Sequence, residues 1–137
     1  MLYIRGGDVN LCNKDGASPL YIASYNGHKD CVDFLLNKGV EVNTCNNNGA
    51  SPLYVASLKG QTTILEMLYY RGGDVNLCYK DGVSPLGISS QNKHKDRVDF
   101  LLNKRAEVNN IYVLIVISRK MLVCIEICHI GFKHICL

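Results

Sequence analysis

Residues 15–43 read DGASPLYIASYNGHKDCVDFLLNKGVEVN, and this stretch decides the fold because its landmarks return every 33 residues along the chain. The spacing is kept through three copies without an insertion, which indicates a tandem repeat. The recurring landmarks are a glycine at 16, 49 and 82, Ser-Pro-Leu at 18–20, 51–53 and 84–86, and Val-Asn at 9–10, 42–43, 75–76 and 108–109.

Each copy predicts a short helix that begins at its Ser-Pro pair. In the first copy, the hydroxyl of Ser18 can cap a free backbone N–H, and the fixed φ of Pro19 suits the first helical position. Gly27 is expected to end this helix with a positive φ. The same chemistry predicts helix starts at Ser51-Pro52 and Ser84-Pro85.

A second helix is predicted from about His28 to Asn37. Val32, Leu35 and Leu36 are spaced three and four residues apart, which places them on one apolar stripe. Gly39 stops this helix, and an extended segment then leads to the next turn. Two such short helices cannot bury their stripe alone, so the copies must stack on one another.

The quoted stretch resembles the ankyrin repeat, whose 33-residue period and Thr-Pro-Leu-His-x-Ala signature it follows. The resemblance covers about residues 1–110 and implies an all-α ankyrin-repeat solenoid with hairpin-like turns. Serine replaces the usual threonine, and Tyr21, Tyr54 and Gly87 replace the usual histidine. Because that histidine normally ties repeats together, the resemblance leaves the bonding between repeats open. The expected units are a partial repeat at 1–12, repeats at 13–45, 46–78 and 79–110, and an apolar tail at 111–137.

The third repeat departs furthest from this pattern. Gly87 falls in the middle of its first helix, and Ser89 replaces a small buried alanine. Lys93 and Arg105 stand where the first repeat has glycines at its helix ends. We therefore expect the third repeat to be degenerate, because a residue other than glycine is strained at positive φ.

A second similarity links every other repeat. Residues 2–18 match 68–84 at 14 of 17 positions, and residues 28–43 match 94–109 at 13 of 16. The copied unit was thus a pair of repeats. We expect the chain to be a piece of a longer array, because it begins inside what would be a second helix.

The tail at 111–137 is rich in apolar residues but follows none of the repeat landmarks. Arg119 and Lys120 interrupt it after a short apolar run, so a membrane span is not expected. One interpretation is a helix that caps the last repeat. The other is that the tail is not evolved structure.

Three groups of residues could carry chemistry, and the sequence favours a structural role for each. Cys12, Cys45 and Cys78 recur at the repeat spacing, which is too wide for disulfides. His28 and Cys31 could form a base and a nucleophile, but no third residue orients them.

A zinc site is likewise not expected. The set Cys124, Cys128, His129, His134 and Cys136 lacks two ligand pairs separated by a loop. The chain also carries no phosphate-loop, zinc-protease or nucleophile-elbow motif. We therefore expect no enzyme activity, no metal and no cofactor.

Composition narrows the partners and the compartment. Charged residues make up 20% of the chain and the net charge is +3, with no basic run interleaved with aromatics, so a nucleic-acid partner is not expected. The start MLYIRGGD lacks the features of a secretory signal. Seven cysteines then indicate free thiols in a reducing compartment, so we expect a cytoplasmic protein, nuclear location being possible.

The resemblance implies a non-catalytic protein–protein interaction module, with another protein as partner and no small-molecule substrate. The alternatives are a spacer segment of a longer array and an enzyme-targeting subunit with the tail as docking helix. Tyr25 and Leu58 are the expected anchors. In ankyrin stacks the turn tips and first helices commonly form a concave groove, which would comprise Lys14, Asp15, Ala17, Tyr25, Asn26, Asn47, Asn48, Ala50, Leu58, Lys59, Lys80, Asp81, Val83, Gln91 and Asn92.

Overall fold

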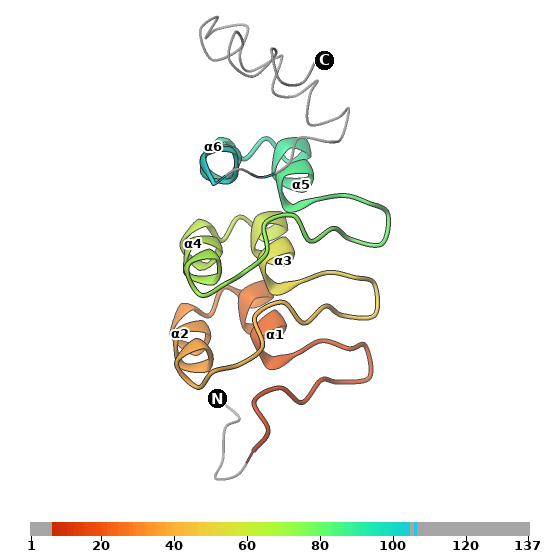
Figure 1. The fold of residues 1–137 in the computed structure, drawn as a ribbon, viewed down its shortest axis with the longest axis vertical. Coiled ribbons are helices and arrows are strands. Elements are labelled where there is room, and N and C mark those ends of the chain that lie inside the picture. The colour runs from red at the N-terminus through yellow and green to blue at the C-terminus, as the bar shows by residue number, and fades with distance from the viewer. Residues whose placement is uncertain (1–6, 105, 107–137) are drawn as a thin grey trace, which may run out of the picture.

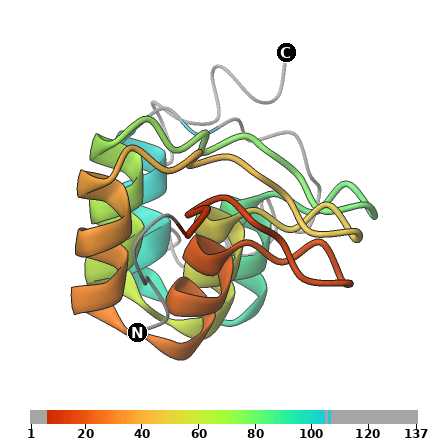
Figure 2. The same ribbon diagram turned by 90° about the horizontal axis from the view of Figure 1, so that it is seen from below.

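The computed structural model describes residues 7–104 and 106, and this part of the chain consists of helices and turns without a strand. The helices stand in two columns, α1, α3 and α5 in one and α2, α4 and α6 in the other (Figure 1). Figure 2 shows three long turns projecting from the first column to one side. The predicted all-α solenoid is confirmed. The helices are α1 (Pro19–Asn26), α2 (Lys29–Asn37), α3 (Pro52–Lys59), α4 (Thr62–Tyr70), α5 (Pro85–Gln91) and α6 (Lys95–Asn103).

The helix starts are those that the Ser-Pro pairs predict. Ser18 Oγ accepts a hydrogen bond from the backbone N–H of Tyr21 at 3.1 Å, and Ser51 and Ser84 cap α3 and α5 in the same way. Gly27 follows α1 with φ 73°, and Gly60 follows α3 with φ 82°. Local chemistry therefore fixes both ends of α1 and α3.

The core lies between the two columns and depends on the neighbouring repeats. Leu20, Leu53 and Leu86 are fully buried, one in each helix of the first column. Ile22 in α1 is 41% exposed, whereas Val55 occupies the same place in α3 and is only 1% exposed. Since the two positions differ in their neighbours and not in their register, burial at this position is set by the adjacent repeat.

Asparagines of the Val-Asn landmark join one repeat to the next. Asn10 Oδ1 accepts a hydrogen bond from the backbone N–H of Glu41 at 2.9 Å, and Asn43 Oδ1 accepts one from Asp74 at 2.8 Å. The Asn43 side chain also donates to the carbonyl of Gly72 at 3.1 Å. These bonds provide polar ties between repeats in a chain that lacks the usual histidine.

The third repeat carries the strain that its sequence predicts. Lys93 takes φ 58°, where its counterparts Gly27 and Gly60 can adopt a positive φ without a side-chain clash. The hydroxyl of Ser89 is buried without a hydrogen-bond partner. Gly87 lies inside α5 as expected, and Arg105 falls outside the described residues.

A buried arginine in α6 adds a second unfavourable feature. Arg97 is only 5% exposed, although its counterparts in α2 and α4 are Cys31 and Ile64. Its Nη1 donates to Thr62 Oγ1 at 3.2 Å, whereas Nε and Nη2 have no partner. An unpaired buried cation is costly, so the junction between the second and third repeats is less favourable than the one before it.

Among the cysteines that the structure describes, Cys12, Cys31 and Cys45 are free thiols. The sulfurs of the 33-residue ladder each donate to a backbone carbonyl two residues earlier, as Cys78 does to Asn76 at 3.3 Å. The tail at 111–137, with its two interpretations and its candidate zinc ligands, lies outside the described residues. Within the described part, no helix reaches the length and apolar character of a membrane span.

We predict that Lys93→Gly stabilises the protein by about 1 kcal/mol, because a side chain other than glycine costs roughly that much in the left-handed region. The measurement is the free energy of unfolding from urea titration. Asn92→Gly is the matched control, since Asn92 has φ −85° and gains nothing from glycine. It should destabilise by about 0.5–1 kcal/mol. An unchanged or lower stability for Lys93→Gly would contradict the strain argument.

Candidate functional site

The candidate site is the inner face, which we define as the surface of α1, α3 and α5 together with the turns at residues 13–17, 46–50 and 79–83 (Figure 2). The two parts meet at an angle because each turn leads directly into a helix of the first column. Side chains from three repeats can therefore gather on one surface.

Four tyrosines gather on the inner face. Tyr21 and Tyr25 of α1 lie with ring centroids 6.4 Å apart, and Tyr54 of α3 stacks on Tyr79 of the third turn at 5.4 Å with the planes 10° apart. Tyr54 is buried, Tyr21 and Tyr79 are half-buried, and Tyr25 is 42% exposed. The rings of Tyr21, Tyr54 and Tyr79 thus help to hold the repeats together, while Tyr25 presents its ring to solvent.

Cations and an amide surround these rings. Lys59 of α3 places its Nζ 4.2 Å from the ring centroid of Tyr25, so a cation of one repeat covers an aromatic ring of the previous repeat. Lys80 Nζ lies 5.8 Å from the centroid of Tyr79. The side chain of Asn46 hydrogen-bonds Tyr21. The inner face is thus aromatic at its centre and polar around it.

This environment raises the pKa of two of the tyrosines. Burial is the main cause of the raised pKa of Tyr21, followed by the nearby Tyr25 and Tyr79, with Lys59 and Asn46 opposing. Burial also raises the pKa of Tyr54, and Tyr79 and Asp81 add to it. Both hydroxyls are therefore held in the neutral form, which can donate as well as accept a hydrogen bond.

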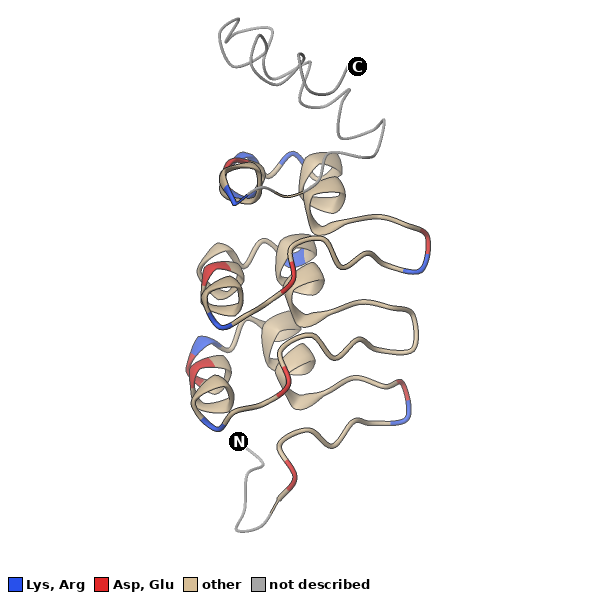
Figure 3. Cartoon of the chain, viewed as in Figure 1, with Lys and Arg blue, Asp and Glu red and all other residues tan. Residues whose placement is uncertain are grey.

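The tips of the turns are bonded to one another. The backbone N–H of Asn47 donates to the carbonyl of Asp15 at 2.9 Å, and its side chain donates to the carbonyl of Lys14 at 3.1 Å. The N–H of Lys80 donates to Asn48 O at 3.0 Å in the same manner. Figure 3 shows charged residues at the tips of the first and third turns and none at the second. The tips form a continuous and preorganised edge of the inner face.

The structure places two of the predicted site residues in the interior. Ala17 is 6% exposed and Ala50 is 3% exposed, so predicting them as groove-lining positions was wrong. Each N–H donates at 3.0 Å to the side chain of an asparagine four residues earlier, Asn13 or Asn46, which folds the turn over the alanine. Leu58 and Val83 are half-buried. The remaining predicted positions are exposed: Lys14, Asp15, Tyr25, Asn26, Asn47, Asn48, Lys59, Lys80, Asp81, Gln91 and Asn92.

Sequence reasoning did not assign Tyr21, Tyr54 and Tyr79 to the candidate site. Tyr21 and Tyr54 take the place of the usual histidine, and Tyr79 stands where the first two turns have Asn13 and Asn46. The signal was therefore present as an aromatic residue at two repeat positions that normally carry polar side chains. Only the fold shows that the two positions meet across neighbouring repeats.

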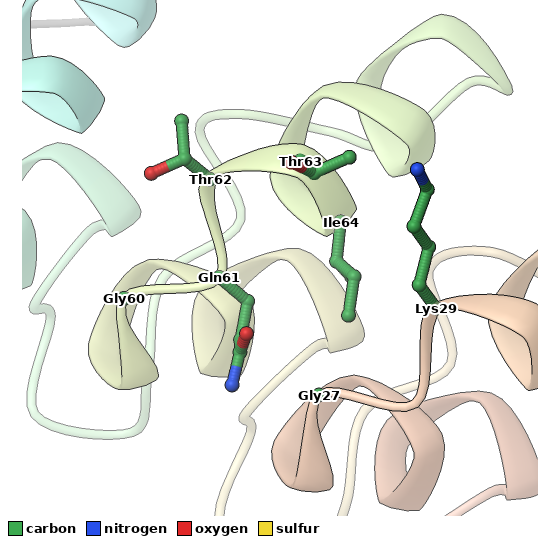
Figure 4. Close-up of a pocket in the computed structure, with 7 residues that line it drawn as sticks. All are labelled: Gly27, Lys29, Gly60, Gln61, Thr62, Thr63 and Ile64. Carbon is green, nitrogen blue, oxygen red and sulfur yellow. The ribbon is translucent and has the colours of Figure 1, made fainter.

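A shallow open pocket of about 350 Å³ lies between the helix connections of the first two repeats, and none of the tyrosines lines it (Figure 4). Lys29 is the charged residue of its lining, and the lining contains no carboxylate, thiol or imidazole. The pocket therefore offers no acid–base pair for catalysis. The lining residues are Gly27, Lys29, Gly60, Gln61, Thr62, Thr63 and Ile64.

The remaining candidates for chemistry do not assemble a reactive centre in the described residues. No three histidine, cysteine or acidic side chains lie close enough to hold a metal ion in this part of the chain. His28 is exposed at the start of α2, whereas Cys31 is half-buried against the core. Burial raises the pKa of the Cys45 thiol, which makes its reactive thiolate less accessible.

Comparison with known proteins gives one family. A family model described as "Ankyrin repeats (3 copies)" matches residues 1–79. The Notch-regulated ankyrin repeat-containing protein of Xenopus tropicalis is 52% identical over 33 residues, which are 24% of this chain and 29% of that protein. The human protein of the same name is 48% identical over 33 residues, which are again 24% of this chain and 29% of that protein. Cortactin-binding protein 2 of Rattus norvegicus is 51% identical over 37 residues, 27% of this chain and 2% of that protein.

We predict that Tyr54→Phe reduces the loss of stability at high pH. A tyrosine ionises near pH 10 in the unfolded chain, and the pKa of Tyr54 is higher in the fold. Its contribution to stability is therefore complete below about pH 10 and is lost as the pH rises toward the folded pKa. Urea titrations between about pH 8 and about pH 11 should show a steeper fall for the wild type than for Tyr54→Phe. Parallel curves would mean that burial does not shift this hydroxyl.

Proposed function

The chain belongs to the ankyrin repeat family, and from that premise we propose that it is a non-catalytic scaffold or adaptor whose inner face binds another protein. Ankyrin repeats are generally protein–protein interaction modules, and the family is generally non-enzymatic. The chain spans less than a third of the Notch-regulated relatives that it matches. The kind of partner is therefore inferred from the surface of this chain and not from those relatives.

The observation that carries the proposal is the exposed ring of Tyr25 among three further tyrosines and Lys59. The positions that correspond to Tyr25 in the next two repeats are Leu58 and Gln91, so the fold itself does not require an aromatic residue there. Tyrosine supplies a large apolar area with a polar end, and it is enriched among the residues that dominate binding energy. Tyr25 is thus the proposed anchor.

The rigidity of the inner face also supports binding. The turn tips are held by backbone bonds between neighbouring turns, and Tyr54 is held by its stack on Tyr79. A surface that is already ordered loses little conformational entropy when a partner docks. Binding through the inner face would therefore require only small changes of side-chain conformation.

The remaining parts of the proposal follow from this role. We propose no cofactor, no small-molecule substrate and no nucleic-acid partner, and we propose a cytoplasmic or nuclear location, in keeping with the free thiols of Cys12, Cys31 and Cys45 in the described part of the chain. A spacer segment differs in one respect, since its partners would not depend on the inner face. An enzyme-targeting subunit would instead depend on the tail at 111–137.

We predict that Tyr25→Ala with Lys59→Ala removes partner binding. The full chain, immobilised, would capture partners from a lysate for identification by mass spectrometry, and one identified partner would then be titrated. Truncation of a central anchor costs at least about 2 kcal/mol, so the affinity should fall by about 30-fold or more. Circular dichroism would verify that the variant keeps its helices.

The matched control is Asp33→Ala with Glu66→Ala, which removes two exposed side chains from the outer helices α2 and α4. This protein should bind as the wild type does. Equal capture by all three proteins would refute binding through the inner face and favour the spacer. Loss in the control alone would move the binding surface to the outer helices.

A further inference from the structure

A column of cations runs along the other side of the molecule, at the ends of the outer helices. Lys38, Arg71 and Lys104 are the C-cap residues of α2, α4 and α6, and they are 33 residues apart. Figure 3 shows a blue segment at the same end of each outer helix, one above the other. Each repeat thus contributes one positive charge to a single edge.

Side-chain contacts connect this column across the repeats. Arg71 Nη2 donates to Asn37 Oδ1 of the previous repeat at 2.8 Å. Lys104 of α6 places its Nζ 5.4 Å from the ring centroid of Tyr69 and 5.2 Å from that of Tyr70, both in α4. The cations of adjacent repeats therefore lie on one continuous surface.

An aromatic cluster lies within the same surface. Tyr69 and Phe100 meet edge to face with centroids 5.6 Å apart, and Tyr70 lies 6.4 Å from Phe100. Tyr70 is 66% exposed. Its counterparts in the first and third repeats are Asn37 and Asn103, so a tyrosine is not needed at this position for folding.

The helix dipole explains only part of this arrangement. A cation near a helix C-terminus is stabilised by the carbonyl groups there, and this accounts for one charge in each repeat. It does not account for an exposed tyrosine between the cations. Exposed aromatic rings beside positive charges are typical of a surface that other proteins contact.

We propose that this outer edge, formed by Lys38, Arg71, Lys104, Tyr69, Tyr70 and Phe100, binds an extended acidic segment of a partner protein. The segment lies along the column with one carboxylate opposite each cation and an apolar side chain against Tyr70. The outer edge is separate from the inner face, so it gives the chain a second binding surface and does not depend on the first.

The spacing of the repeats sets the register of the segment. Packed helices are separated by about 8–10 Å, and a chain in the extended polyproline II conformation advances about 3.1 Å per residue with three residues per turn, so that every third side chain lies on the same side. Adjacent cations therefore match acidic residues three positions apart.

The column is short for a site that binds double-stranded nucleic acid. Proteins that bind a duplex can contact about 6–10 phosphates, whereas this column has three cations.

Acidic side chains on the outer helices restrict where the segment can lie. Asp33, Glu66 and Asp99 precede the three cations by five residues each. Five residues correspond to about 140° around a helix, so this acidic row lies on a different side of the helices. An acidic segment is repelled from that row and attracted to the outer edge, which favours a single orientation.

Fluorescence anisotropy with a labelled synthetic peptide tests the proposal. The probe is a peptide of about twelve residues with glutamate at every third position and one phenylalanine, and the comparison peptide has the same composition with its glutamates adjacent. The outer variant is Lys38→Gln, Arg71→Gln and Lys104→Gln. The inner control is Lys14→Gln, Lys59→Gln and Lys80→Gln, which changes the net charge by the same amount.

The spaced peptide should bind the wild-type chain more tightly than the comparison peptide. The outer variant should bind it about tenfold more weakly, because three exposed ion pairs are lost, and the inner control should bind it as the wild type does. Tyr70→Ala should also weaken binding, and it keeps the test decisive if the outer variant fails to fold. The Tyr25→Ala and Lys59→Ala protein should keep its affinity, so a failure of the inner face would not affect this result.

Several results would overturn the proposal. If the outer variant and the inner control weaken peptide binding equally, the peptide responds only to the net charge of the chain. Equal affinities for the two peptides would contradict the proposed three-residue register. An unchanged affinity in Tyr70→Ala would contradict the proposed contact with the aromatic ring. Tighter binding of single-stranded RNA or of anionic lipid vesicles, lost in the outer variant, would assign the edge to a different class of ligand.

Discussion

Burial of the helix pairs by their neighbours is the interaction on which the rest of this structure depends. No single pair of short helices can enclose residues such as Leu20, Leu53 and Leu86, yet all three are fully buried in the stack. The contrast between Ile22 and Val55 shows the same dependence on a neighbouring repeat. Strict 33-residue spacing follows, because each apolar stripe must meet the stripes beside it.

The same constraint leaves other positions free to serve binding. The Ser-Pro-Leu landmark is kept in each repeat, whereas Tyr25, Leu58 and Gln91 occupy one equivalent place with three different side chains. Tyr70 differs from Asn37 and Asn103 in the same way. Surfaces of this kind can change without disturbing the stack, which is why both candidate binding surfaces are found where the repeats differ.

The sequence was sufficient to predict the features that local chemistry decides. Ser18 and Gly27 mark the two ends of α1 as expected, and Lys93 takes the predicted strained conformation. The burial of Ala17 and Ala50 was missed because it depends on how an asparagine side chain closes each turn. The contact of Tyr54 with Tyr79 was missed because it joins positions 25 residues apart that meet only between stacked repeats.

Hydrogen exchange of Leu53→Ala tests most directly whether stacking holds the structure together. The substitution removes a buried side chain of the middle repeat, which costs about 2–5 kcal/mol. Stability shared between neighbours predicts faster amide exchange in α1, α2, α5 and α6 as well as in α3 and α4. Exchange that becomes faster only in α3 and α4, with the other four helices unchanged, would contradict the account.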